Sequence, residues 1–168
     1  ENVYRISKNS RSFKEIRQTG LECIGTANLI ETVEVIYLAL RSLESISKNY
    51  VLEISHIGLV EAIMNQYGIE ESLAAKLLTA ISRKSSDELY SLCKQNDVSS
   101  EACNALTVLT ENFPDTSRAL YYISEICHSQ DAKINFSNLS HIVQFIRQKG
   151  YGENIKIDFS IANDMNYY

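Results

Sequence analysis

The chain has 168 residues, of which 45% are hydrophobic and 22% are charged, the usual balance of a folded globular domain. This length corresponds to one domain, or to one domain with a small insertion. No run of about 18 apolar residues is present, which excludes a transmembrane helix. The N-terminus lacks the basic and apolar regions of a signal peptide. We therefore expect a folded protein that is located in the cytoplasm and has no membrane partner.

The charge pattern argues against a nucleic acid as the main partner. The chain has 16 basic and 21 acidic residues, a net charge of −5. The basic side chains gather only at Lys8, Arg11, Lys14 and Arg17. A nucleic-acid-binding domain usually has a longer basic stripe. The short cluster is more typical of a solvated face or of a small anion site.

The cysteines and histidines do not have the spacing of a metal site. The four cysteines stand far apart, at Cys23, Cys93, Cys103 and Cys127, and no two have CxxC spacing. The three histidines also lack a ligand pattern. We expect no metal and no cofactor. Each cysteine has apolar neighbours, so we expect four buried free thiols, which fits a reducing compartment.

The first 25 residues have the pattern of a β-hairpin. Residues 3–6 and 13–24 read as two strands that are joined by a polar turn. On the second strand Gln18, Gly20 and Glu22 share one face, because strand side chains alternate. The glycine leaves room between two polar groups, which suits a small ligand. The same pattern also fits a strand face that is simply exposed.

The rest of the chain predicts an α+β fold with a helical insertion. Apolar residues recur at helical spacing over residues 29–48, and a short strand follows at residues 51–55. Five short helices are then expected, at residues 59–67, 70–82, 86–94, 99–112 and 115–129. A helix at residues 139–149 and a strand at residues 155–161 complete the pattern. We expect one antiparallel sheet made of the hairpin and the two later strands. The predicted parts are 1–58 and 132–168 for the core and 59–131 for the insertion.

Two segments resemble a known family. Tyr4-Arg5, together with residues 13–25 and their Gln18-x-Gly20-x-Glu22 pattern, resembles motif 2 of class II histidyl-tRNA synthetases. That motif has an FRxE strand, a loop and a Q-x-G-x-E strand. Residues 157–168, which end in Tyr-Tyr, resemble the histidine-specific motif R-G-L-D-Y-Y. The order of the elements between them also agrees. The resemblance implies a class II synthetase-like core. It also implies a fragment without motifs 1 and 3, as does the absence of a starting Met.

Two departures from the family pattern affect catalysis. Ser7 stands where motif 2 has the Glu that helps to hold ATP, and Asn163 stands where R-G-L-D-Y-Y has its Arg. An Asn supplies neither the permanent charge nor the two-pronged donor geometry of a guanidinium. Losing such a group typically removes about 3 kcal/mol or more of transition-state stabilisation. We therefore expect no catalytic residues in this chain.

The residues that recognise histidine in the family are retained in this sequence. The resemblance implies that Glu22 accepts a proton from the imidazole and that Tyr168 hydrogen-bonds its other nitrogen. It implies further that Gln18 accepts from the α-ammonium and that Arg5 pairs with a carboxylate or another anion. Histidine recognition is thus kept while adenylation chemistry is damaged.

This combination is similar to the regulatory subunits of ATP phosphoribosyltransferase, which are paralogues of histidyl-tRNA synthetases. Such subunits have no catalysis of their own. They activate a short catalytic subunit that makes phosphoribosyl-ATP in the first step of histidine biosynthesis, and histidine inhibits the assembly. The resemblance implies three partners: the ATP phosphoribosyltransferase catalytic subunit, L-histidine, and further copies of the parent protein. Whether histidine uses the inherited pocket or a subunit interface is left open.

Two other hypotheses remain. One is a histidyl-tRNA synthetase with unusual motifs, although a tRNA ligand needs a basic surface that this chain lacks. The other is an interaction domain whose polar strand face is exposed and binds no small molecule. Histidine binding separates this last hypothesis from the first two.

Overall fold

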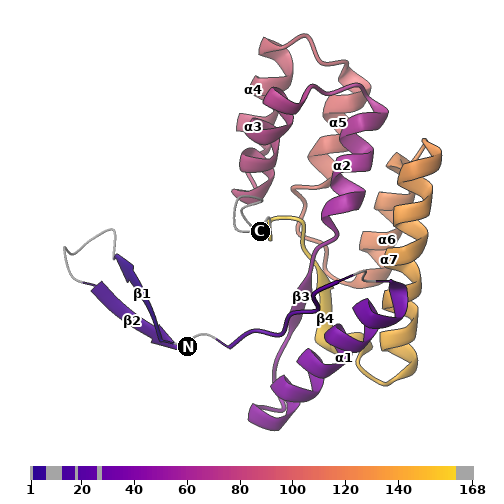
Figure 1. Ribbon diagram of the computed structural model, residues 1–168. Helices are drawn as coiled ribbons and strands as arrows, with labels where there is room; N and C mark the ends of the chain where they lie inside the picture. Colours follow the sequence, from indigo (N-terminus) through magenta and orange to yellow (C-terminus); the bar gives the residue numbers. More distant parts are fainter. Residues whose placement is uncertain (1, 7–12, 18, 26–27, 162–168) are drawn as a thin grey trace.

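Two short strands lie at the centre of the molecule, with helices around them (Figure 1). The computed structural model describes residues 2–6, 13–17, 19–25 and 28–161. Their elements are β1 (Asn2–Ile6), β2 (Phe13–Arg17), α1 (Leu29–Ile46), β3 (Leu52–Ile54), α2 (Ile57–Gln66), α3 (Glu71–Ser82), α4 (Ser86–Gln95), α5 (Ser100–Val108), α6 (Thr116–Ile126), α7 (Gln130–Gln148), η1 (Gly152–Asn154) and β4 (Ile155–Ile157). The hairpin β1–β2 projects away from the rest. We call α2 to α6 the helical block.

The central strands are parallel, which corrects the expectation of one antiparallel sheet. In the described residues, β1 pairs with β2 in an antiparallel hairpin, and β3 pairs with β4 in a separate parallel sheet. Alternating residues predict a strand but not its direction, so the sequence pattern fits both arrangements. The connection decides the direction, because parallel strands need a crossover of a dozen or more residues. Helices α2 to α7 form that crossover.

Two strands are shorter than the alternation predicts. The second hairpin strand ends at Arg17, and residues 19–25 form no strand. Strand β4 ends at Ile157, because the next residue turns the chain. The Asp158 carboxylate accepts a hydrogen bond from the backbone N–H of Ser160 at 2.9 Å, the geometry of an Asx turn.

Local capping explains why most predicted helices are confirmed. Asn28 and Glu31 form a reciprocal capping box at the start of α1. Ser85, Ser99 and Asp115 accept backbone hydrogen bonds at the starts of α4, α5 and α6. These signals lie within four residues of each helix start, so sequence alone reveals them.

Helix α7 begins earlier than predicted. It runs from Gln130, whereas the sequence pattern indicated a start near Leu139. Its first turns contain Ile134, Asn135, Ser137 and Asn138, which have modest helix propensity. Packing outweighs that propensity, because Ala132 is fully buried in the core. Ser129 caps the helix by accepting from Ala132 N at 3.1 Å.

The cap of α2 is a histidine. His56 Nδ1 accepts a hydrogen bond from Leu59 N at 3.1 Å. Burial lowers the pKa of His56, so the ring is neutral at pH 7 and keeps the lone pair that this cap requires.

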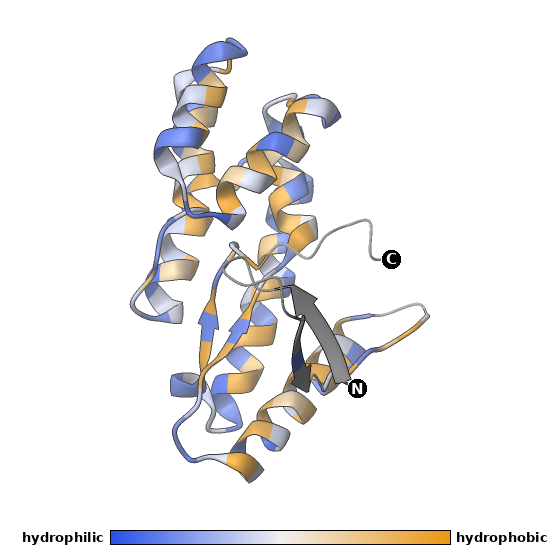
Figure 2. Cartoon of the chain, turned by 90° about the vertical axis from the view of Figure 1, so that its left-hand side faces the viewer, coloured by the Kyte–Doolittle hydropathy of each residue, from blue (hydrophilic) through white to orange (hydrophobic). Residues whose placement is uncertain are grey.

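One hydrophobic core joins the central strands to the helices. It contains Leu40 of α1, Ile81 and Leu106 of the helical block, Val143 of α7 and Ile157 of β4, all at most 1% exposed. Figure 2 shows apolar positions along the helix faces that adjoin the strands. The division into residues 1–58, 59–131 and 132–168 stays a prediction.

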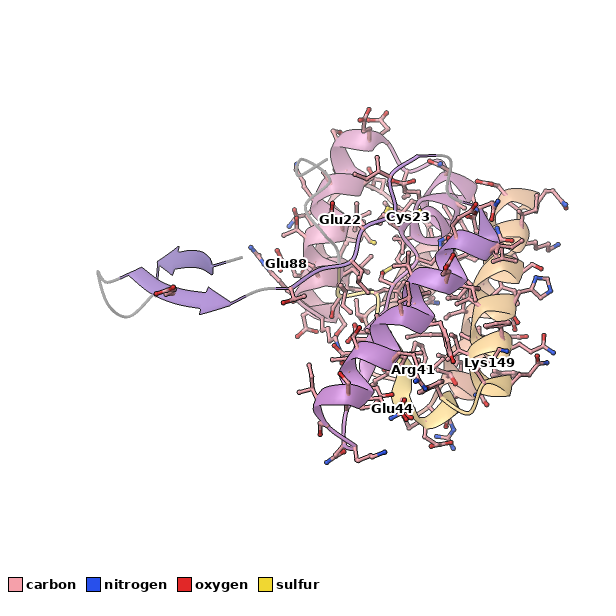
Figure 3. The ribbon with its side chains drawn as sticks, turned by 60° about the horizontal axis from the view of Figure 1, so that its bottom comes forward. Glu22, Cys23, Arg41, Glu44, Glu88 and Lys149 are labelled. Carbon is pink, nitrogen blue, oxygen red and sulfur yellow. The ribbon has the colours of Figure 1, made fainter. Side chains whose placement is uncertain are left out.

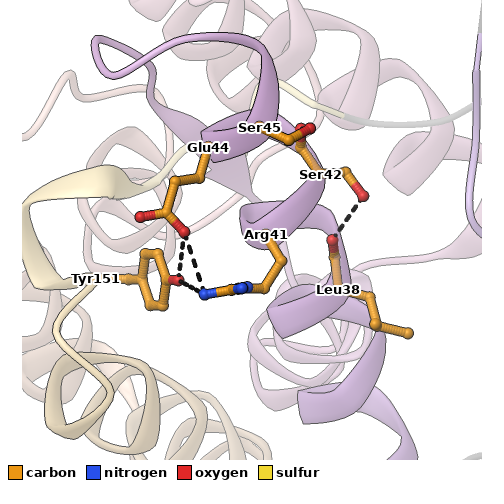
Figure 4. A network of polar contacts seen from close by, with 6 residues as sticks. All are labelled: Leu38, Arg41, Ser42, Glu44, Ser45 and Tyr151. Atoms are coloured by element: carbon orange, nitrogen blue, oxygen red, sulfur yellow. Dashed lines mark hydrogen bonds and ion pairs between the residues drawn. The ribbon is translucent and has the colours of Figure 1, made fainter.

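A polar network fixes α1 against the turn that follows α7 (Figure 4). The Tyr151 hydroxyl donates to Glu44 Oε2 at 2.8 Å and accepts from Arg41 Nη1 at 3.4 Å. Tyr37 packs edge-on against the Tyr151 ring, with centroids 5.8 Å apart. Arg41 and Glu44 also form an ion pair that is largely exposed. Such a pair contributes only about 0–1 kcal/mol to folding stability, so the network determines the orientation of α1 more than the stability of the fold.

Gln66 connects the end of α2 to the turn between α6 and α7. Its Oε1 accepts from the backbone N–H groups of His128 and Ser129, both at 2.7 Å. Its Nε2 donates to the Ile126 carbonyl at 3.1 Å. One side chain thus satisfies three backbone groups that the turn leaves without helical partners.

Gln66→Ala should destabilise the protein by about 1–3 kcal/mol, because it leaves these backbone groups without their partner. Urea unfolding of the full-length protein measures the change. Gln95→Ala is the control: Gln95 is exposed at the end of α4, and its replacement should stay within about 0.5 kcal/mol of wild type. Equal effects of the two changes would contradict the role of Gln66.

Candidate functional site

One face of the β3–β4 pair is apolar and the other is polar. The apolar face, which belongs to the core, has Leu52, Ile54, Ile155 and Ile157. Because side chains alternate, Glu53 and Lys156 point to the opposite face, where they are register partners. Asp158 continues this face, since its N–H donates to the Ile54 carbonyl at 2.9 Å. We call Glu53, Lys156 and Asp158 the polar sheet face.

Asp158 is the buried anion of this face. Its side chain is 7% exposed, and its Oδ2 accepts from Lys84 Nζ at 2.6 Å. Its Oδ1 accepts from Ser160 Oγ at 2.6 Å and from Ser160 N at 2.9 Å. Burial alone would raise the pKa of Asp158, but the hydrogen bonds from Lys84 and Ser160 outweigh it and hold that pKa below its ordinary value. The carboxylate is therefore ionised, and both of its oxygens accept hydrogen bonds from protein donors.

The helical block contacts the polar sheet face at two points. Lys84 reaches Asp158 from the turn between α3 and α4. Lys156 donates to the side-chain carbonyl of Asn112, which follows α5. One contact comes from the turn between α3 and α4 and the other from the segment after α5, so together they determine how the block lies over the strands.

Beside β3 lies a small apolar pocket of about 320 Å³. It is lined by Cys23, Thr32, Val35, Ile36, Ile54 and Ser55. Cys23 belongs to residues 19–25, the segment that runs past α1 in Figure 3. Its neighbour Glu22 is exposed and does not line the pocket. The segment from motif 2 thus lies next to the end of β3.

The four predicted histidine-binding residues are only partly described. Arg5 lies in β1 of the projecting hairpin, and Glu22 lies in the segment before α1. Gln18 and Tyr168 lie outside the described residues, as does Asn163. The histidine-binding set therefore stays a prediction.

Sequence reasoning missed Lys84 and Asn112. Asp158 gave a weak signal, as a polar residue within an alternating strand. Lys84 gave none, because it pairs with a residue 74 positions away. A helix-terminal lysine reads as an ordinary exposed charge until the fold is known.

The expectation of four buried thiols is wrong for Cys23. It is exposed, whereas Cys93, Cys103 and Cys127 are buried and free. Burial raises the pKa of Cys93 to about 12, helped by a hydrogen bond with Cys103. It raises the pKa of Cys127 to about 11. These two thiols are protonated at pH 7 and therefore poor nucleophiles.

Neither a metal centre nor a membrane span is found in the described part of the chain. No three His, Cys, Asp or Glu side chains gather there in a way that could hold a metal ion. None of the described helices is both long and apolar enough to cross a membrane.

The order of the elements agrees with a class II aminoacyl-tRNA synthetase-like core: a hairpin at the motif 2-like segment, a long helix, a strand, a helical insertion and a final strand. The family model of histidyl-tRNA synthetase matches residues 1–168. The chain therefore belongs to the histidyl-tRNA synthetase family, and the resemblance found in its two motifs is confirmed.

Curated relatives from Bacillus thuringiensis (strain Al Hakam) and Bacillus cereus (strain AH820) are 26% identical over 172 residues. Both are named ATP phosphoribosyltransferase regulatory subunit. The match covers 99% of this chain and 40% of theirs, so the chain spans about two fifths of these relatives.

Two solved structures share the fold. One is an ATP phosphoribosyltransferase regulatory subunit/histidyl-tRNA synthetase from Bacillus halodurans, with a TM-score of 0.78 and 22% identity. The match covers 100% of this chain and 44% of the chain in that structure. The other belongs to an ATP phosphoribosyl transferase (HisG:HisZ) complex from Thermotoga maritima, with a TM-score of 0.71 and 20% identity. The match covers 100% of this chain and 58% of the chain in that structure.

Asp158→Asn should destabilise the full-length protein at neutral pH, by about 1–3 kcal/mol, because Lys84 loses its anion. The folded-state pKa of Asp158 lies below its ordinary value of 3.8. Its stabilisation is therefore complete above pH 3.8 and is lost as the pH falls through the folded-state pKa. Urea unfolding between about pH 7 and about pH 3 should show the two proteins converging at the acidic end. Asp97→Asn, an exposed control, should show no such trend, and a pH-independent gap for Asp158→Asn would contradict the ion pair.

Proposed function

We propose that this chain acts in a non-catalytic regulatory subunit that assembles with and activates a short-form ATP phosphoribosyltransferase in the cytoplasm. The observation that carries the proposal is Asn163, which stands where the family's histidine-specific motif has an Arg. Without that cation, the negative charge that develops during adenylation has no fixed partner. The chain keeps the fold of a synthetase but lacks a group that the synthetase reaction needs.

The relatives support the regulatory role. The curated proteins that match almost the whole chain are named as regulatory subunits of ATP phosphoribosyltransferase. A structure of the same fold comes from an assembled ATP phosphoribosyl transferase complex. The partner of this chain would accordingly be the catalytic subunit, and the regulatory protein would also associate with itself.

The proposal includes a histidine site made of Arg5, Gln18, Glu22 and Tyr168. Glu22 supports it, because its side chain is exposed and has no hydrogen-bond partner among the described residues. Gly20 also supports it: a Cβ placed there would meet no described atom within 4 Å. A free carboxylate next to open space suits the N–H of an imidazole.

A second candidate is a histidyl-tRNA synthetase. The family model favours it, as does the Bacillus halodurans protein, whose description includes both functions. The Ser7 and Asn163 positions argue against it, since each removes a charged group that the family motifs contain.

The regulatory function is tested by mixing the full-length protein with a short-form catalytic subunit and following phosphoribosyl-ATP formation. Activity should rise only in the mixture, because the catalytic subunit needs its regulatory partner. It should fall when histidine is added, because histidine would favour the less active state of the assembly. Absence of activation would contradict the proposal. Histidine-dependent ATP–pyrophosphate exchange would then identify a synthetase, and the absence of both activities together with no histidine binding would identify an interaction domain.

Glu22→Gln should weaken histidine binding by about 10- to 100-fold, the usual value of a hydrogen bond to a charged group. Titration calorimetry on the full-length protein measures the dissociation constant. Glu34→Gln is a matched control, because Glu34 is an exposed carboxylate on α1 that does not line the pocket containing Cys23. Equal affinities of the Glu22 variant and wild type would exclude Glu22 from the site.

A further inference from the structure

Lys84 occupies a backbone position that favours glycine. At the end of α3 the N–H of Lys84 donates to Ile81 O at 2.9 Å, and the N–H of Ser85 donates to Ala80 O at 3.0 Å. This pair of bonds is a Schellman motif, whose central residue adopts a left-handed conformation. Lys84 has φ of 52°, where a Cβ is unfavourable and glycine is preferred. A lysine at this position therefore calls for another explanation.

The Lys84 side chain supplies that explanation. Its ammonium lies 2.6 Å from Asp158 Oδ2, across the boundary between the helical block and the central strands. The carboxylate is 7% exposed, while the Lys84 side chain is 37% exposed. A carboxylate so far from water needs a cation, because its burial without one is costly. The turn of α3 and α4 is thus bonded to the first residue after β4.

Asp158 in turn determines the shape of the chain that follows it. Its second oxygen holds both the N–H and the hydroxyl of Ser160, and its carbonyl accepts from Ile161 N at 3.4 Å. Phe159 between them is 3% exposed and belongs to the core. Residues 158–161 therefore form one turn organised by a single carboxylate. This turn begins the stretch of sequence that carries Tyr168.

Asp97 offers an internal comparison. It follows α4 with φ of 53°, and Val98 N donates to Cys93 O at 3.0 Å, as in the turn after α3. Asp97 is exposed and makes no ion pair within the described ranges. Two helices thus end in the same backbone conformation with a residue other than glycine. Of these two residues, only Lys84 has a side chain that contacts the polar sheet face.

We propose that Lys84 is a positioning residue through which the helical block sets the conformation of residues 158–161 and, with it, the affinity of the histidine site. The second half of this statement rests on the proposed function. When the block is in place, Lys84 neutralises Asp158 and the turn is ordered. Without the Lys84 ammonium, the carboxylate loses its cation and the turn opens to water. Histidine binding and the Lys84–Asp158 contact then stabilise each other, because coupling between two sites is reciprocal.

The test compares Lys84→Gly with Asp97→Gly in the full-length protein. Both changes relieve the left-handed strain, so strain relief alone would act alike in both. Lys84→Gly should accelerate hydrogen exchange of the Ser160 and Ile161 amides by about tenfold or more, because their turn loses its support. It should also weaken histidine binding by at least about fivefold, the lower end of usual couplings. Asp97→Gly should change neither quantity, and Lys84→Arg should restore both to within about twofold of wild type.

Each outcome decides one part of the proposal. Unchanged exchange at Ser160 and Ile161 in Lys84→Gly would overturn the positioning role. Accelerated exchange with an unchanged histidine dissociation constant would overturn the link between Lys84 and the ligand site. A wild-type protein that binds no histidine would count against the proposed function instead, and the exchange pattern would still decide whether Lys84 positions residues 158–161.

Discussion

A parallel pair of three-residue strands constrains the whole structure. Two such strands expose too little apolar surface to be stable alone, and their direction requires a long crossover. The chain meets both needs with the same residues, because helices α2 to α7 connect β3 to β4 and also supply most of the core. The helical block is therefore part of the hydrophobic core and not an attachment to a finished domain.

That arrangement gives the central strands two different faces. The apolar face is filled by the core, while the opposite face has charged residues that bond to the helical block. A change in the position of the block would alter the polar contacts of β4 first, since apolar packing tolerates small shifts better than a directed ion pair does.

The sequence predicted local features well and distant ones poorly. Capping residues such as Ser85 and Ser99 act on N–H groups three residues away, so they were visible without a fold. The direction of β4 and the partner of Lys84 depend on residues far along the chain, which no local pattern contains. The start of α7 was missed because tertiary packing of Ala132 outweighs helix propensity. The histidine-binding residues came from resemblance to a family, since periodicity alone left the face of Gln18 and Glu22 open to two interpretations.

The unequal burial of the thiols gives the protein a natural labelling site. Cys23 is exposed, whereas the other three thiols of the chain are buried. Alkylating reagents need an accessible thiolate, so they would select Cys23 among these four without any mutation. This residue is adjacent to Glu22 and lines the pocket beside β3. A fluorophore attached there would report directly on events at the motif 2 segment, and its modification would be slowed by any ligand or partner that covers that segment.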